Sequence, residues 1–201
     1  MKKTFILGVT GFIGSGKSTL CRFLHEKYGF HWINADSFVH DLYKFDMPGY
    51  KKIKKYFGND FAGNEGVKRE VLRDYVSKNP KKLFLLNRLI HPLVFKEVNK
   101  KVVQLKRLSE GKNPLLVCIE SVYFDDKRLG KFVDQFVFVD APDKKILNRL
   151  KKRKVPKNHL QALLDFQRKN FKEKGTYINN NGSLRDFHRS VVKLLRTYGY
   201  S

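Results

Sequence analysis

Residues 11–18 constrain the fold of this chain more strongly than any other segment. They read G-F-I-G-S-G-K-S, which satisfies the pattern G-x-x-x-x-G-K-[ST], and they lie between the apolar run 5–9 and residues 20–28, whose apolar side chains recur at helical spacing. In such a strand, loop and helix, the glycines let backbone amides point at phosphates, and the helix N-terminus adds partial positive charge. The segment therefore predicts a phosphate-binding loop, and a glycine turn that binds nothing fits this context poorly.

The residues of this loop have separate tasks. Lys17 is expected to reach the β- and γ-phosphates of a nucleotide, and Ser18 to place its hydroxyl on Mg²⁺. The other candidate nucleotide-binding residues here are Gly11, Gly14, Ser15, Gly16 and Thr19. The loop predicts nucleotide binding but leaves kinase, GTPase and ATPase open, because it does not decide where the γ-phosphate goes.

Strands and helices alternate along most of the chain, which predicts an α/β fold with a parallel sheet flanked by helices. Between residues 46 and 112 the pattern changes to basic, amphipathic helical segments, so we expect a helical insertion there. The predicted strands are 5–9, 31–33, 115–120, 136–140 and one that begins at 178, and the predicted later helices are 143–153, 156–168 and 184–198.

The composition indicates a folded and strongly basic protein. Of 201 residues, 41% are hydrophobic, and 42 Lys and Arg against 19 Asp and Glu give a formal net charge of +23. The basic residues either cover solvated helix faces or form a field that attracts phosphates or nucleic acid. The net charge alone does not decide between these two interpretations. No apolar run approaches the roughly 20 residues that cross a bilayer, so we expect no membrane partner.

A reducing, cytoplasmic location is expected. Cys21 and Cys118 lie far apart in apolar stretches and resemble neither a disulfide framework nor a metal cluster. The N-terminal segment imitates a secretory signal only superficially, because glycines at 8, 11 and 14 interrupt its apolar run.

Asp36 is the candidate catalytic base. It follows the short strand 31–33, and a carboxylate at the C-terminal end of a neighbouring parallel strand faces the same crevice as the phosphate-binding loop. There it could orient a hydroxyl that attacks the γ-phosphate and accept its proton. The alternative is that Asp36 or Ser37 only caps the helix that starts at this point.

Three further candidates surround the expected site. Arg149 and Arg153, four residues apart on one helix face, could neutralise charge on the transferred group when a lid closes, although a solvated basic helix is the alternative for each of them. Glu120 ends an apolar strand where a carboxylate could hold magnesium through water, with Asp125 and Asp126 nearby as competing choices. The histidines show no metal-ligand spacing.

Several segments, taken in order, resemble the dephospho-coenzyme A kinases, which phosphorylate the ribose 3′-hydroxyl of dephospho-CoA with ATP. The loop is followed by Ile33-Asn34-Ala35-Asp36, which is similar to the family's I-D-A-D segment, and then by a match to its L-[LI]-H-P-L segment. The matching stretches are residues 8–19, 33–36, 89–93, 134–140, Gln167 and 178–182. The resemblance runs nearly from end to end.

The resemblance implies a molecule of three parts. They are a nucleotide-binding core at 1–45, 113–147 and 178–201, a helical CoA-binding insertion at 46–112, and a lid at 148–177. It also implies that Asp36 is the catalytic base, that His91 contributes to the dephospho-CoA side, and that ATP and dephospho-CoA are the substrates in the last step of coenzyme A biosynthesis.

The chain departs from the family pattern at five positions, which are Phe12, Asn34, His40, Ser121 and Asn170. They bear on an ATP-side arginine clamp and on CoA recognition, and Arg168 or Lys169 is a candidate replacement for the missing arginine. Two alternatives stay open: a nucleic-acid-associated NTPase, for which the net charge would be the main evidence, and another small-molecule or nucleoside kinase.

Overall fold

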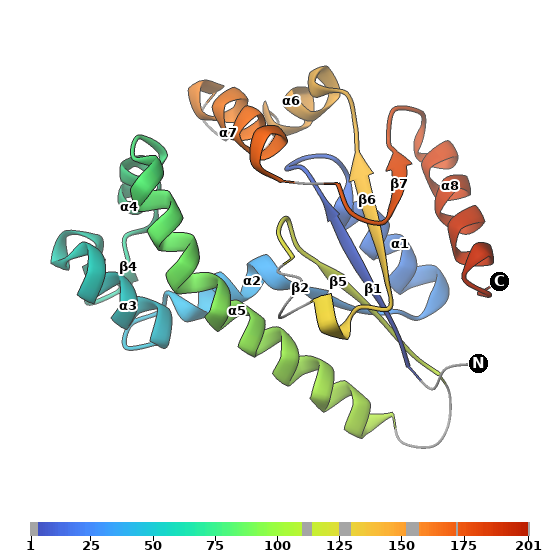
Figure 1. The fold of residues 1–201 in the computed structure, drawn as a ribbon, viewed down its shortest axis with the longest axis horizontal. Coiled ribbons are helices and arrows are strands. Elements are labelled where there is room, and N and C mark those ends of the chain that lie inside the picture. Colours follow the sequence, from blue (N-terminus) through green and yellow to red (C-terminus); the bar gives the residue numbers. More distant parts are fainter. Residues whose placement is uncertain (1–3, 110–113, 125–129, 152–156, 172, 201) are drawn as a thin grey trace. The chain divides into compact units, whose positions relative to one another are not determined.

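A five-stranded sheet with the strand order β2-β5-β1-β6-β7 forms the centre of the first of two compact units (Figure 1). The computed structural model describes residues 4–109, 114–124, 130–151, 157–171 and 173–200, and the first unit comprises residues 1–33 and 108–201. Strand β1 pairs in parallel with β5 and β6, and β6 pairs in parallel with β7. The strands are β1 (Thr4–Gly11), β2 (His31–Asn34), β5 (Leu115–Glu120), β6 (Gln135–Asp140) and β7 (Thr176–Asn179).

Helices α1 (Lys17–Tyr28) and α8 (Leu184–Thr197) pack on the same face of this sheet. Alternate residues of β1, which are Phe5, Leu7 and Val9, point to this face and are buried together with apolar residues of both helices. From α8 the buried residues are Phe187, Val191, Leu194 and Leu195, spaced as one helix face. This core fixes the start of α1, and with it the loop that precedes α1.

A second apolar cluster joins α6 (Asp143–Lys151) and α7 (Lys157–Asn170) to the carboxyl end of β6. Phe12 and Phe138 meet edge to face in this cluster, with ring centroids 5.1 Å apart. Ile146 and Leu150 of α6 and Leu164 of α7 complete it. The cluster therefore places α6 and α7 beside residues 11–18.

The second unit, residues 34–107, consists of helices and one short hairpin. Leu42, Tyr50, Ile53 and Leu72 are buried residues of its first three helices. The helices are α2 (Ala35–Leu42), α3 (Pro48–Phe57), α4 (Arg69–Ser77) and α5 (Pro80–Leu108), and the hairpin strands are β3 (Ala62–Gly63) and β4 (Gly66–Val67). Single turns of 3₁₀-helix lie at Asn59–Phe61 in this unit and at Gly130–Phe132 in the first.

The sequence predicted the α/β architecture correctly, and each predicted strand is present. The helices of the insertion are also present, but residues 62–67 form a hairpin that periodicity did not reveal, because each strand has only two residues. None of the helices that the structure describes is long and apolar enough to cross a membrane.

Candidate active site

The loop at residues 11–18 is folded against other parts of the first unit so closely that it requires glycine. Gly16 has φ 118°, and a Cβ atom on it would lie 2.2 Å from the side-chain nitrogen of Asn180. Gly11 has φ 142°, and a Cβ there would lie 2.0 Å from the carbonyl oxygen of Val139. A larger residue at either position would force the loop away from its supports.

Three side chains from other elements hold the loop backbone. The Gln167 Oε1 atom accepts a hydrogen bond from the Ile13 amide at 2.8 Å, and the Asn180 amide group donates to the Ser15 carbonyl at 2.8 Å. Both side chains are buried. Arg149 donates to the carbonyls of Gly14 and Ser15 at 3.2 and 3.1 Å. The loop is therefore preorganised by residues that lie more than 130 positions away in the sequence.

Arg149 thus contacts the loop itself. Its guanidinium also donates to the carbonyl of Asn180 at 3.3 Å, and desolvation by burial lowers its pKa below the ordinary arginine value. The sequence predicted Arg149 as a nucleotide ligand, and the structure adds this support of the loop. Its expected companion Arg153 lies outside the described residues.

Lys17 is folded back onto the loop. Its ammonium group donates to the carbonyls of Gly11 and Phe12 at 3.1 and 3.0 Å, and only 6% of the residue is exposed. A buried charge is costly without partners, and in this structure the two carbonyls stabilise the ammonium group. When a nucleotide binds, its phosphates are expected to take over this stabilisation. The hydroxyl of Ser15 is buried beside it and has no hydrogen-bond partner among the residues that the structure describes.

Ser18 and Glu120, two separate candidates for holding magnesium, are hydrogen-bonded to each other. The Ser18 hydroxyl donates to Glu120 Oε1 at 2.6 Å, and the second carboxylate oxygen accepts from the indole N–H of Trp32 at 3.1 Å. Glu120 is 4% exposed, so this carboxylate is held in one orientation at the end of β5. The hydrogen bond from Trp32 could not be predicted from the sequence, because Glu120 lies 88 residues away.

Asp36 does not cap helix α2, which begins at Ala35. The cap of α2 is Asn34, whose side-chain oxygen accepts from the Asp36 amide at 3.0 Å, and Asp36 lies in the first turn. The hydroxyl of Ser37 donates to the Asn34 carbonyl at 2.7 Å. The alternative that Asp36 or Ser37 is the cap is therefore wrong, and a task for the Asp36 carboxylate has to be sought elsewhere. His91 belongs to α5 of the same unit, where its ring lies 5.9 Å from that of Phe95.

Arg168 has a different environment from the one expected of a phosphate clamp. Its guanidinium donates to Asp143 at 2.8 Å and to Asp140 at 3.3 Å, and lies 4.4 Å above the ring of Phe12. Burial opposes its charge, but the carboxylates of Asp143 and Asp140 raise its pKa above the ordinary arginine value. Arg168 thus ties α7 to the end of β6.

A sequence model of the dephospho-CoA kinases matches residues 5–186 of the chain. The chain belongs to the dephospho-CoA kinase family. This is a family of ATP-dependent kinases that catalyse the final step of CoA biosynthesis. The dephospho-CoA kinase of Carboxydothermus hydrogenoformans is 30% identical over 199 residues, which cover 96% of this chain and 94% of that protein.

Solved structures show the same fold. A protein from Thermus thermophilus gives a TM-score of 0.68 at 24% identity, covering 98% of both chains. The dephospho-CoA kinase from Campylobacter jejuni gives 0.58 at 20% identity, covering 98% of this chain and 96% of that one.

Two of the departures from the dephospho-CoA kinase pattern have a structural explanation. The ring of Phe12 is buried in the apolar cluster with α6 and α7, where it contacts Phe138 and Arg168. Ser121, at the position of the family's proline, donates to the Tyr123 carbonyl at 2.8 Å and makes a local turn through its hydroxyl.

Two others have side-chain partners of their own. Asn170 donates to the carbonyl of Phe166 at 2.7 Å on its own helix. The ring of His40, at the position of the family's arginine, lies 2.7 Å from the guanidinium of Arg69 on α4. A guanidinium group is therefore present beside residue 40, although another helix supplies it.

Proposed function

We propose that this chain transfers the γ-phosphate of ATP to the ribose 3′-hydroxyl of dephospho-CoA. The observation that carries the proposal is the phosphate-binding loop, which is built and supported at residues 11–18 of a chain that matches the family over residues 5–186. The basic net charge of +23 suits this reaction, because both substrates carry several phosphate charges.

Binding of ATP would use groups that already lie at the loop. The backbone amides of Gly14, Gly16 and their neighbours would bind the phosphate oxygens at the start of α1. Lys17 would exchange its two carbonyl partners for the β- and γ-phosphates and stabilise the charge on the transferred group. The buried Ser15 hydroxyl is a further donor that a phosphate oxygen would satisfy.

The residues at the end of β5 fit a magnesium ion. Ser18 and Glu120 offer a hydroxyl and a carboxylate, which are the oxygen ligands that Mg²⁺ prefers, and they already lie in contact. Since Mg²⁺ usually keeps several waters, two protein oxygens suffice, and the described residues contain no cluster of three acidic, His or Cys ligands. Ser18 and Glu120 would hold the ion, whose positive charge would neutralise charge on the ATP phosphates.

Asp36 and His91 would act on the acceptor. We assign to Asp36 the task of orienting the 3′-hydroxyl and accepting its proton, because the helix cap, its competing task, belongs to Asn34. His91 would contact the dephospho-CoA side. We further assign the insertion at 46–112 to CoA binding and the segment 148–177 to a lid, and we place the reaction in the cytoplasm, which suits two free, buried cysteines.

The test is ADP release from ATP and Mg²⁺ with dephospho-CoA, beside reactions with adenosine, with nucleoside monophosphates and with no acceptor. Turnover with dephospho-CoA alone is the expected result. The variant D36N should lose at least a hundredfold in kcat while it still binds ATP, and Lys17→Ala should lose ATP binding as well. ADP release that is indifferent to the acceptor, or full activity in D36N, would refute the proposal.

A further inference from the structure

The exposed face of α8 carries a row of cations that the proposed reaction does not use. Arg185, Arg189, Lys193 and Arg196 follow one another at intervals of four, four and three residues, so they fall within an arc of roughly 80° on the helix surface. All four are exposed, whereas the opposite face of α8 is buried against the sheet. The row is roughly 16 Å long at 1.5 Å per residue.

This row is only weakly neutralised. Arg189 lies 3.3 Å from Asp186, and both side chains are exposed. The carboxylate of Asp186 is also engaged by the cap residue Ser183. None of the ion pairs between described residues includes Arg185, Lys193 or Arg196. Because the whole chain carries +23, distant acidic groups do not compensate this face.

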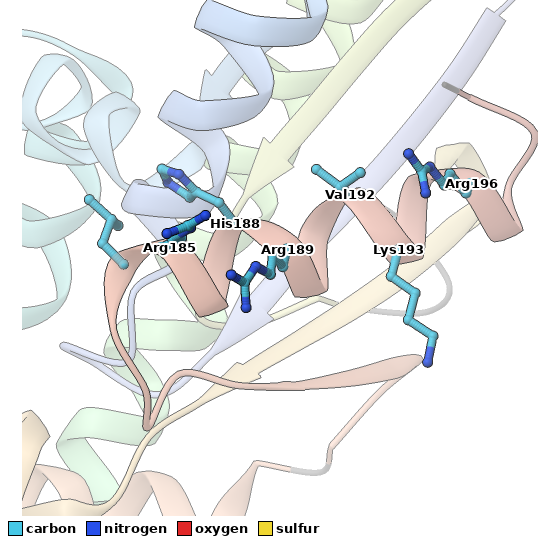
Figure 2. A pocket seen from close by; sticks show the side chains of 7 residues that line it. Arg185, His188, Arg189, Val192, Lys193 and Arg196 are labelled. Carbon is cyan, nitrogen blue, oxygen red and sulfur yellow. The ribbon is translucent and has the colours of Figure 1, made fainter.

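An aromatic ring lies beside the cations. The imidazole of His188 stacks on the ring of Phe23 from α1, with centroids 3.9 Å apart and planes inclined by 15°. His188, Val192 and Leu184 border a shallow hollow of about 750 Å³ together with the four cations (Figure 2). The face therefore combines a line of positive charge with a stacked ring at its edge.

These features favour one kind of ligand. A lipid surface would require several apolar side chains to insert, but the apolar face of α8 is buried in the core and Leu184 is an isolated exposed apolar side chain at the start of the helix. A chain of phosphates that also carries flat rings would meet both the cations and His188. Single-stranded nucleic acid has this chemistry, because its unpaired bases can stack on aromatic side chains while its backbone follows a basic surface.

We propose that the face of α8 formed by Arg185, His188, Arg189, Lys193 and Arg196 binds single-stranded RNA. The phosphates lie along the four cations, and a base stacks on the His188 ring. None of these residues belongs to the phosphate-binding loop or to the side chains that hold it, so the binding is separate from phosphate transfer.

The test measures the salt dependence of binding by the full chain to a fluorescein-labelled, 12-nucleotide single-stranded RNA. Four phosphate contacts predict a loss of affinity of about 50-fold between 50 and 200 mM salt. In the triple variant R185Q/K193Q/R196Q one contact remains, and the loss should shrink to about threefold. The matched control K96Q/K101Q/R107Q on α5 removes the same charge and should behave as the original chain.

Two further readouts complete the test. H188A should weaken RNA binding several-fold with an unchanged salt dependence, and H188F should restore it, since stacking does not depend on charge. The α8 triple variant should keep its turnover of dephospho-CoA, which shows that it is folded. Equal effects of the two triple variants, an unchanged salt dependence in the α8 variant, or equal binding of a duplex RNA would overturn the proposal. So would binding to anionic vesicles without binding to RNA.

Discussion

The carboxylate of Glu120 is held by two donors, and they have different consequences for the reaction. Ser18 would share a magnesium ion with Glu120, whereas Trp32 only fixes the second oxygen through its indole N–H at 3.1 Å. Trp32 is therefore a positioning residue whose effect should be visible in the metal dependence rather than in the chemistry at saturation.

We expect Trp32→Phe to raise the Mg²⁺ concentration for half-maximal activity about tenfold, because one hydrogen bond to a buried carboxylate is lost. At saturating Mg²⁺ its kcat should return to near the original value. The measurement is initial rate against free Mg²⁺, with His31→Ala on the same strand as control. A lower melting temperature with unchanged Mg²⁺ dependence would assign Trp32 to packing alone.

Arg69 supplies a guanidinium beside His40. His40 lies one helical turn after Asp36, so the two share a face of α2, and Arg69 reaches His40 from α4 at 2.7 Å. In the proposed function this places a cation near the acceptor's phosphates.

Arg69→Ala should therefore raise the KM for dephospho-CoA about tenfold and leave the KM for ATP unchanged, because only the acceptor side loses a cation. The double variant His40→Arg/Arg69→Ala should recover most of the affinity. Arg73→Ala is the matched control, since Arg73 lies on the same helix and pairs with exposed Asp74. Equal effects of the two alanine variants would argue against this role.

At the scale of elements, α8 begins with a reciprocal capping box. The Ser183 hydroxyl accepts from the Asp186 amide at 3.2 Å, and Asp186 accepts from the Ser183 amide at 3.2 Å. Ser183→Ala should lower the free energy of unfolding by about 1 kcal/mol, measured by urea denaturation at pH 7. Arg185→Gln, which leaves the box intact, is the control and should have little effect.

The same box predicts a pH dependence. Hydrogen bonds from Ser183 lower the pKa of the Asp186 carboxyl below 3.8, so its ionised form stabilises the folded state. This contribution is fully present above pH 3.8 and is lost as the pH falls through the lowered pKa. The stability difference between the original chain and Asp186→Asn should therefore be constant from pH 7 to pH 5 and vanish in acid. A difference that persists below the lowered pKa would contradict this.

Elements with long periodic patterns could be predicted from the sequence, and short or locally capped ones could not. The apolar runs that became β5 and β6 were visible, and so was the amphipathic pattern of α8. The β3–β4 hairpin was missed, because two-residue strands have no periodicity. The cap of α2 was assigned wrongly, because Asn34, Asp36 and Ser37 are all good caps and only the backbone angles distinguish them.

At the scale of the whole molecule, the sequence predicted the residues of the loop but not what holds it. The motif at 11–18 is local, whereas the supports Arg149, Gln167 and Asn180 reach it from α6, α7 and the turn after β7. The sequence made Ser18 and Glu120 separate candidates for holding magnesium, and the structure adds that the two side chains are in contact. The hydrogen bond from Trp32 to Glu120 could not be predicted, since no sequence pattern relates two side chains that are 88 positions apart.

The charge of +23 is itself a property of the whole chain, and it should cost stability at low ionic strength. Like charges repel in the compact state, and most ion pairs between described residues are exposed and individually weak. Between about 10 and 150 mM NaCl the screening length falls from about 30 to about 8 Å. We therefore expect the melting temperature to rise with salt, by about 2–4 °C for each 1 kcal/mol of repulsion relieved.

Three charge reversals test whether repulsion between like charges causes the melting temperature to rise with salt. Lys96→Glu, Lys101→Glu and Arg107→Glu together lower the net charge from +23 to +17, because each changes the sum by two. This variant should melt higher than the original chain at 10 mM NaCl and gain less from added salt, as followed by circular dichroism. If the original chain instead melted at a lower temperature in 150 mM NaCl than in 10 mM NaCl, attraction within ion pairs would outweigh repulsion between like charges. The fold would then be stable at its net charge without a polyanionic ligand.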